Sequence, residues 1–265
     1  MAMAYGIYKT KRRDGSPSYR VSFYHEKKHI SIGSYRSLSE AEASLDEALR
    51  FYDDPSVTIW NFASRLHHIS ADKAVSIINH RDRGVYFKTP IYLMNGYFLY
   101  FLQGMGIYKF DNDDLFYYST HRILVHDGHL YVNDYGSQYS LFQRYGIRSY
   151  AVAGTDYDFA NGDPYDLRYE NIIVKNPYTG VRAVEGLRLA GFEARIHIRG
   201  YYSLGTFKTP EEAALAYNKA VDLLWSHGFQ KNYTKNYITE FSSEQYQTMY
   251  NRITLPDNFM RFLNG

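Results

Sequence analysis

The amino-acid sequence predicts an α+β protein in which two small modules flank a middle domain, each module being a three-stranded antiparallel sheet with one helix. The main observation is an internal repeat, because short alternating strands followed by a helical segment occur near both ends of the chain. From Ser31 and Ser203 onward the copies align without a gap, 172 residues apart. Before that point they are expected to differ by three residues, placed in the turns 24–30 and 199–202. The expected segments are 1–55 (N-terminal module), 56–177 (middle domain), 178–228 (C-terminal module) and 229–265 (helical tail).

The second strand of each module alternates between apolar and polar side chains, the pattern of a strand with one buried face. In the C-terminal copy the side chains expected to face the helix are Phe192, Ala194, Ile196 and Ile198, and those expected to face away are Glu193, Arg195 and His197. In the N-terminal copy the inward set is Tyr19, Val21 and Phe23, and the outward set is Ser18, Arg20 and Ser22.

The helix of each module has a clear predicted start. Ser37 with Glu40, and Thr209 with Glu212, have the spacing of a capping box, and Pro210 occupies the favoured first helical position. Alanines at matched positions, namely Ala41, Ala48, Ala213 and Ala220, allow each helix to lie close to its sheet. We therefore expect the helix to cover one sheet face and to leave the other bare, with arginine and histidine on it.

The composition excludes several chemistries. The chain has 265 residues, 45% of them hydrophobic, and no cysteine, which excludes disulfides, thiolate nucleophiles and cysteine-based zinc sites. The most apolar stretch, 91–102, is interrupted by Asn95 and Gly96 and is shorter than the roughly 20 residues of a membrane helix. No secretory signal pattern is present at Met1. We expect a cytoplasmic protein with no membrane partner and no cofactor.

Positive charge is concentrated at the N-terminus. Residues 1–36 hold two acidic residues and eight basic ones, a net charge of +6: Lys9, Lys11, Arg12, Arg13, Arg20, Lys27, Lys28 and Arg36. Since the whole chain carries +2, the remainder is at −4. A basic face on a near-neutral protein suits a polyanion. A hairpin kept soluble by its charges would show the same pattern.

A narrow basic sheet also fits a DNA groove. The major groove of B-DNA admits a two-stranded β-ribbon, where arginine pairs with guanine while lysines and hydroxyls contact phosphates. A solvated face is ordinary for an antiparallel sheet, so polar residues there do not by themselves establish binding.

The C-terminal copy resembles a known family. Its segments 180–182 (Gly-Val-Arg), 194–196 (Ala-Arg-Ile) and 204–220, beginning Leu-Gly-Thr-Phe, resemble the DNA-binding domain of plant ethylene-response factors of the Apetala type. That family reads the major groove with its sheet. The resemblance implies base contacts by Arg182, Arg195 and His197, with Lys208 nearer the backbone. The N-terminal copy matches more loosely, with Tyr8 in place of the arginine, and its candidate DNA contacts are Tyr8, Lys9, Arg20, Ser22 and Arg36.

The segment 158–172 resembles the core of phage and homing HNH endonucleases, a ββα unit that often precedes an ethylene-response-type module in phage and bacterial proteins. By this resemblance Asp158 matches a metal-binding carboxylate and Asn171 the asparagine that orients the base. The position of the general-base histidine is Phe159, which cannot accept a proton. We therefore assign no catalytic residue and no metal site, and treat Asp158 and Asn171 as vestigial.

Three functions remain open. The first is a sequence-specific protein that binds double-stranded DNA, a transcriptional regulator derived from a mobile HNH endonuclease and lacking cleavage activity. The second is an active nicking or homing endonuclease with an unrecognised base. The third is a structural or RNA-binding protein whose tyrosines stack on single-stranded bases. The expected partner is double-stranded DNA in the cytoplasm of a bacterial or phage-infected cell, and a homodimer is left open.

Overall fold

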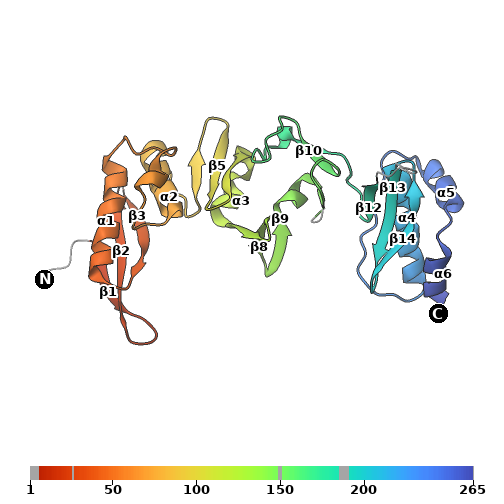
Figure 1. The fold of residues 1–265 in the computed structure, drawn as a ribbon, viewed down its shortest axis with the longest axis horizontal. Helices are drawn as coiled ribbons and strands as arrows, with labels where there is room; N and C mark the ends of the chain where they lie inside the picture. Colours follow the sequence, from red (N-terminus) through yellow and green to blue (C-terminus); the bar gives the residue numbers. More distant parts are fainter. Residues whose placement is uncertain (1–5, 26, 149–150, 185–190, 265) are drawn as a thin grey trace. The chain divides into compact units, whose positions relative to one another are not determined.

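The computed structural model describes residues 6–25, 27–148, 151–184 and 191–264. It confirms the α+β class, with helices and small antiparallel sheets along the chain (Figure 1). The chain forms two compact units, residues 1–139 with 163–171 and residues 140–162 with 172–265. This division does not follow the four expected segments, because one hydrophobic cluster runs from the N-terminal module as far as Phe101.

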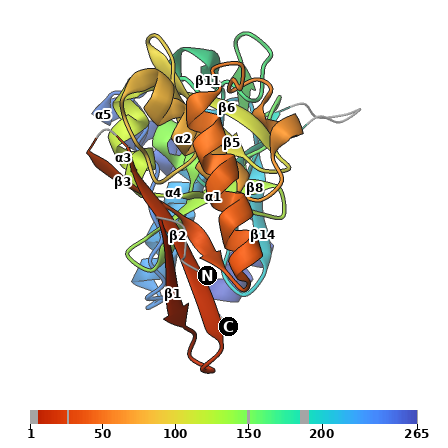
Figure 2. The ribbon, with the colours of Figure 1, turned by 90° about the vertical axis from the view of Figure 1, so that its left-hand side faces the viewer.

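The first unit begins with the expected module. Strands β1 (Ile7–Lys11), β2 (Pro17–His25) and β3 (Lys28–Tyr35) pair in that order, and helix α1 (Leu38–Asp53) lies beside them (Figure 2). The predicted capping box is present, since Ser37 accepts a hydrogen bond from the Glu40 N–H and Glu40 accepts one from the Ser37 N–H. The start of α1 is therefore fixed by local sequence.

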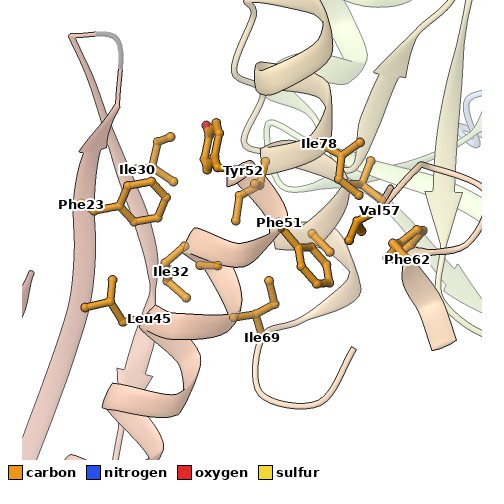
Figure 3. Close-up of a cluster of buried hydrophobic side chains, with 14 of the residues drawn as sticks. Phe23, Ile30, Ile32, Leu45, Phe51, Tyr52, Val57, Phe62, Ile69 and Ile78 are labelled. Atoms are coloured by element: carbon orange, nitrogen blue, oxygen red, sulfur yellow. The ribbon is translucent and has the colours of Figure 1, made fainter. Parts of the chain in front are cut away.

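The core of this module continues into the next helix. Figure 3 shows Phe23, Ile30 and Ile32 of the sheet beside Leu45 and Phe51 of α1. The same cluster includes residues of the short helix η1 (Phe62–Arg65) and of α2 (Ala71–Arg83). A three-stranded sheet with one helix buries little apolar surface, so this extension adds to its stability.

Two charged side chains fix α1 to the chain that follows it. The buried carboxylate of Glu47 accepts hydrogen bonds from three successive backbone N–H groups, those of His67, His68 and Ile69. The guanidinium of Arg81 donates to the carbonyls of Phe51, Asp54 and Val57. These carbonyls lie at and just after the end of α1, where helical partners are lacking.

The rest of the first unit is built from small sheets. Strands β4 (Ile91–Leu93), β5 (Tyr97–Leu102) and β6 (Gly106–Asp111) form one sheet. The short helices η2 (Asn112–Asp114) and α3 (Leu115–Thr120) precede a second sheet of β7 (Ile123–His126), β8 (His129–Asp134) and β9 (Ser137–Ser140). The last element of this unit is η4 (Tyr169–Asn171).

The second unit contains η3 (Leu141–Tyr145) and a two-stranded sheet of β10 (Tyr157–Phe159) and β11 (Ile172–Val174). The C-terminal module follows as β12 (Val181–Val184), β13 (Gly191–His197), β14 (Tyr201–Phe207) and α4 (Pro210–Ser226). Here the cap is arranged differently, because Glu212 accepts from the Lys208 N–H while Thr209 accepts from the Glu212 N–H.

The helical tail packs on this module. Helix α6 (Asp257–Asn264) contributes Phe259 and Leu263 to its core, and helix α5 (Ser243–Arg252) packs the partly buried Met249 and Tyr250 against it. The Asn236 side chain bonds both backbone groups of Thr179, and its own backbone bonds the Asn218 side chain. The tail is thus part of the module's structure.

Both modules share one irregularity. One extra residue of the third strand, Ile32 or Leu204, lies opposite the step Val21–Ser22 or Ala194–Arg195. At that step the Ser22 N–H donates to the Gly6 carbonyl at 2.9 Å, and the Arg195 N–H donates to the Gly180 carbonyl at 2.7 Å. The bulge and its hydrogen bond recur at equivalent positions in the two copies.

This register corrects the sequence alignment. Val21 pairs with Ile7 and Ala194 pairs with Val181, so Ser22 corresponds to Arg195 and Arg20 corresponds to Glu193. The expected difference of three residues in one turn is wrong, because the copies differ by one residue in each of two turns. Sequence similarity favours superposing Arg20 on Arg195, but strand pairing sets the true correspondence.

We predict that Gly180→Ala destabilises the C-terminal module by about 2–4 kcal/mol, because an added Cβ would collide with the Tyr217 ring, lie 2.7 Å from the Arg195 carbonyl and require a positive φ of 74°. The control is Gly228→Ala, which shares a positive φ of 82° but meets open space and should cost about 1 kcal/mol. Denaturant unfolding followed by circular dichroism measures both. Equal losses in the two variants would show that close packing at Gly180 is unimportant.

Candidate nucleic-acid interface

The face of the first sheet that α1 leaves uncovered is polar and aromatic. The pairing places Tyr8, Arg20 and Ser34 in one row across the three strands. All three are exposed, Tyr8 at 51% of its surface. Among the described residues no carboxylate lies within 4.0 Å of the Arg20 guanidinium. This face therefore presents a cation at its centre beside a phenol and a hydroxyl.

Two of the expected contacts in this module are not available on the open face. Ser22 is only 3% exposed at the bulge, although it was expected to point outward. It is a short side chain in the middle strand with paired backbone on both sides. Lys9 is exposed, but it shares a row with Tyr19 and Tyr35, which belong to the helix-covered face. Lys9 thus lies at the edge of the sheet and not on its open face.

The matching row of the second sheet is occupied by an ion pair. Arg182 and Glu193 are cross-strand partners, with Arg182 Nε 2.5 Å from a Glu193 carboxylate oxygen. They stand where the first module has Tyr8 and Arg20. The charge of Arg182 is therefore largely neutralised within the sheet, in contrast to Arg20.

Arg195 and His197 share an aromatic neighbour on the same face. The Arg195 guanidinium lies 4.8 Å from the centre of the Tyr201 ring, and the His197 ring lies 4.8 Å from it on the paired strand. Tyr201 is 68% exposed. The cation–π contact limits the freedom of Arg195 while leaving its hydrogen-bond donors available.

Sequence reasoning missed the aromatic partners in both modules. Tyr24 pairs with His29 across β2 and β3, with ring centres 5.0 Å apart. These positions correspond to His197 and Tyr201, with the histidine and tyrosine exchanged between strands. The signal in the sequence is an aromatic side chain at the end of the strand, at a position that alternation assigns to the polar face.

Arg36 and Lys208 occupy equivalent positions. Both are exposed and immediately precede the N-cap residue of their helix. The backbone N–H of each donates to the glutamate at the third helical position. Each cation therefore stands where the third strand passes into the helix, at the border of its module.

The segment that resembles an HNH core holds no cluster of metal ligands. The Asp158 carboxylate is 2.9 Å from the Lys175 ammonium, and this hydrogen bond, with a further one from the Phe159 N–H, holds the pKa of Asp158 below its usual value. Asn171 is buried and donates to the carbonyls of Asp163 and Asp166. Asp158 belongs to the second unit and Asn171 to the first.

The described part of the chain contains no group of three histidine, aspartate or glutamate side chains placed to hold a metal ion. The segment that resembles an HNH core contains two paired strands, β10 and β11, as a ββα unit would. The element after β11 is strand β12 of the next module and not the helix of such a unit. Phe159, at the general-base position, lies in β10 and is partly buried.

We predict that Lys175→Met raises the pKa of the Asp158 carboxyl toward that of an ordinary aspartate, since the largest stabiliser of its charged form is lost. A pH titration of the side-chain carboxyl by ¹³C NMR measures this, with Lys235→Met, which pairs with Asp222, as a control for charge removal. Addition of Mg²⁺ to the unaltered protein should leave the Asp158 resonance in place. A shift at submillimolar Mg²⁺ would mean that Asp158 holds a cation after all.

Comparisons with known proteins give no assignment: no protein-family model, no curated protein and no solved structure matches this chain. Among the described helices, none is both long and apolar enough to span a membrane.

Proposed function

We propose that this chain binds double-stranded DNA through the open sheet faces of its two modules, and that it acts in the cytoplasm as a sequence-specific transcriptional regulator without cutting DNA. The observation that carries the proposal is the repeated module. Two copies with little sequence identity keep the same register, the same bulge and a bare face that carries arginine, histidine and tyrosine. Packing explains the covered face, but it gives no reason for these side chains on the bare face.

The open faces of the two sheets are suited to different kinds of DNA contact. The first has Arg20 without a carboxylate neighbour among the described residues, together with the basic hairpin around Arg12 and Arg13, which suits phosphate contacts. The second has Arg182 and Arg195 held by Glu193 and Tyr201. Side chains held in one geometry favour base reading, because less conformational entropy is lost on binding.

The absence of cleavage is part of the proposal. Phosphodiester hydrolysis of this type needs a base and a bound metal. The Phe159 side chain cannot accept a proton, and the Asp158 carboxylate is paired with the Lys175 ammonium. The Asn171 side chain donates hydrogen bonds to the backbone carbonyls of Asp163 and Asp166, so a structural role explains its burial.

We predict steeply salt-dependent duplex binding with distinct effects of single arginines. Arg195→Ala should cost about 1–3 kcal/mol at the preferred site and relax selectivity at one or two base pairs, whereas Lys208→Ala should weaken all sequences equally. Arg20→Ala tests the first module, and is preferable to deleting residues 1–52 because that would expose the core shared with α2. Fluorescence anisotropy after selection from random duplexes measures these losses. Uniform, equal losses in all three variants would mean that neither sheet reads bases, and preference for single strands would favour the RNA-binding alternative.

We predict that the purified protein leaves supercoiled plasmid intact in Mg²⁺ or Mn²⁺, because Phe159 stands at the general-base position and the described residues hold no group of metal ligands. Gel electrophoresis over a time course measures nicking, with Asp158→Ala as the matched variant. Nicking that disappears in Asp158→Ala would establish an active endonuclease and overturn this part of the proposal.

A further inference from the structure

We propose that Arg148, which lies outside both modules in the sequence, is a phosphate-contacting residue at the β12 edge of the C-terminal sheet, the sheet that carries Arg195. This inference rests on the proposed DNA binding and deepens it, because it assigns a residue from the segment between η3 and β10 to the interface. Neither the repeat nor either family resemblance points to this position.

Hydrogen bonds place Arg148 next to the module. Its guanidinium is 2.8 Å from the Asp156 carboxylate, and the Asn176 side chain donates to the same carboxylate oxygen at 2.7 Å. The Asn176 side-chain nitrogen also donates to the Val181 carbonyl at 3.0 Å. Val181 is the first residue of β12 and pairs with Ala194, the neighbour of Arg195. Arg148 is thus connected to the edge strand β12 through the side chains of Asp156 and Asn176.

The network is built to hold this position. Asp156 is buried and also accepts a hydrogen bond from the Val152 N–H, and its carbonyl accepts from the backbone of Lys175 and Asn176. These contacts close the segment that carries Arg148 onto the residues that lead into β12. A guanidinium supported in this way is directed by the fold and does not sample many positions.

Arg148 is nevertheless incompletely satisfied. Its Nε is buried, and no hydrogen-bond acceptor for it is found in the described structure. The side chain remains 23% accessible. Burial lowers the pKa of Arg148, and the nearby positive charge of Arg195 acts in the same direction. The Asp156 carboxylate is paired with Arg148, so the charge of Arg195 remains as an excess positive charge, which an approaching phosphodiester would offset.

The phosphate of a nucleic-acid backbone is the ligand that this chemistry favours. Guanidinium groups bind phosphate oxygens through paired N–H donors, and backbone contacts fix how a recognition element sits on the duplex. A phosphate at Arg148 would position the face that carries Arg195 and His197. Arg148 is therefore expected to affect every duplex, whereas Arg195 affects preferred sequences.

The test compares three variants of the full chain on a fluorescein-labelled random duplex and on the duplex selected by the unaltered protein. Arg148→Gln should weaken binding to both by about five- to tenfold and reduce the slope of log Kd against log salt by about one. Asp156→Asn should tighten binding about two- to fivefold, because it removes the carboxylate that competes with phosphate. Arg252→Gln on α5, where an equal charge is lost on a helix that packs against α4, should bind as the unaltered protein does.

A purely structural role makes a different prediction. If Arg148 only supports the fold, both Arg148→Gln and Asp156→Asn should bind more weakly in proportion to lost thermal stability, and this result would overturn the inference. Arg148→Gln alone leaves the buried Asp156 carboxylate without its guanidinium partner, and the double variant Arg148→Gln/Asp156→Asn removes that carboxylate as well. A slope of log Kd against log salt that is still reduced by about one in the double variant would support the inference. An unchanged salt slope in Arg148→Gln would overturn the inference and leave the proposed DNA binding intact. No duplex binding by the unaltered protein would overturn both.

Discussion

The hydrogen bond from the middle strand, opposite the bulge, to the carbonyl of the glycine before the first strand is the constraint on which each module depends. It joins Ser22 to Gly6 in one copy and Arg195 to Gly180 in the other. Both glycines have positive φ, and an added Cβ at Gly6 would lie 2.8 Å from the Ser22 carbonyl. The strands can approach this closely only without a side chain there. The bulge in turn increases the local twist and decides which residues face away from the helix.

The elements of the modules could be predicted from the sequence because their signals are local. Capping residues, alanines at helical spacing and strand alternation each act within a few positions, as the start of α1 at Ser37 illustrates. The strand register could not be predicted in the same way. The bulge at Ile32 shifts the alternation of the third strand, so that Ile32 faces the core while Ser34 lies on the open face. The equivalence of Arg20 with Glu193 therefore emerges only from the pairing.

The candidate site shows the same division between local and non-local information. Arg182 and Arg195 were recognised from a sequence resemblance, but the ion pair of Arg182 with Glu193 depends on register. Ser22 was misjudged because alternation does not predict how a short side chain is covered at a bulge. The position of Arg148 is even harder to predict from local sequence. Its place beside the sheet depends on Asp156 and Asn176, which lie 8 and 28 positions later in the chain.

Each module gains support on its helix side, by different means. In the first unit Glu47 and Arg81 connect α1 to the chain that follows, and the core continues into α2. In the second unit Asn236 joins the tail to α4, and Lys219 of α4 donates to the carbonyls of Tyr250 and Ile253 at the end of α5. Sheets this small need additional packing. Because the support comes against the helix, the opposite face of the sheet remains available.

The two open faces differ in charge because one cross-strand pair of residues differs between the sheets. Where the first sheet has Tyr8 and Arg20, the second has Arg182 and Glu193. A carboxylate at the centre of a sheet repels phosphates, so the second face has less general attraction for a polyanion than the first. Under the proposed function, that carboxylate would accept a hydrogen bond from a cytosine amino group, while Arg182 would donate to guanine through terminal N–H groups other than the Nε–H that contacts Glu193. For the DNA binding that we propose, such a face would need cations at its border, and Lys208 and Arg148 are our candidates for them. Under the proposed function, the first module would contribute mainly charge, and the second would contribute discrimination between sequences.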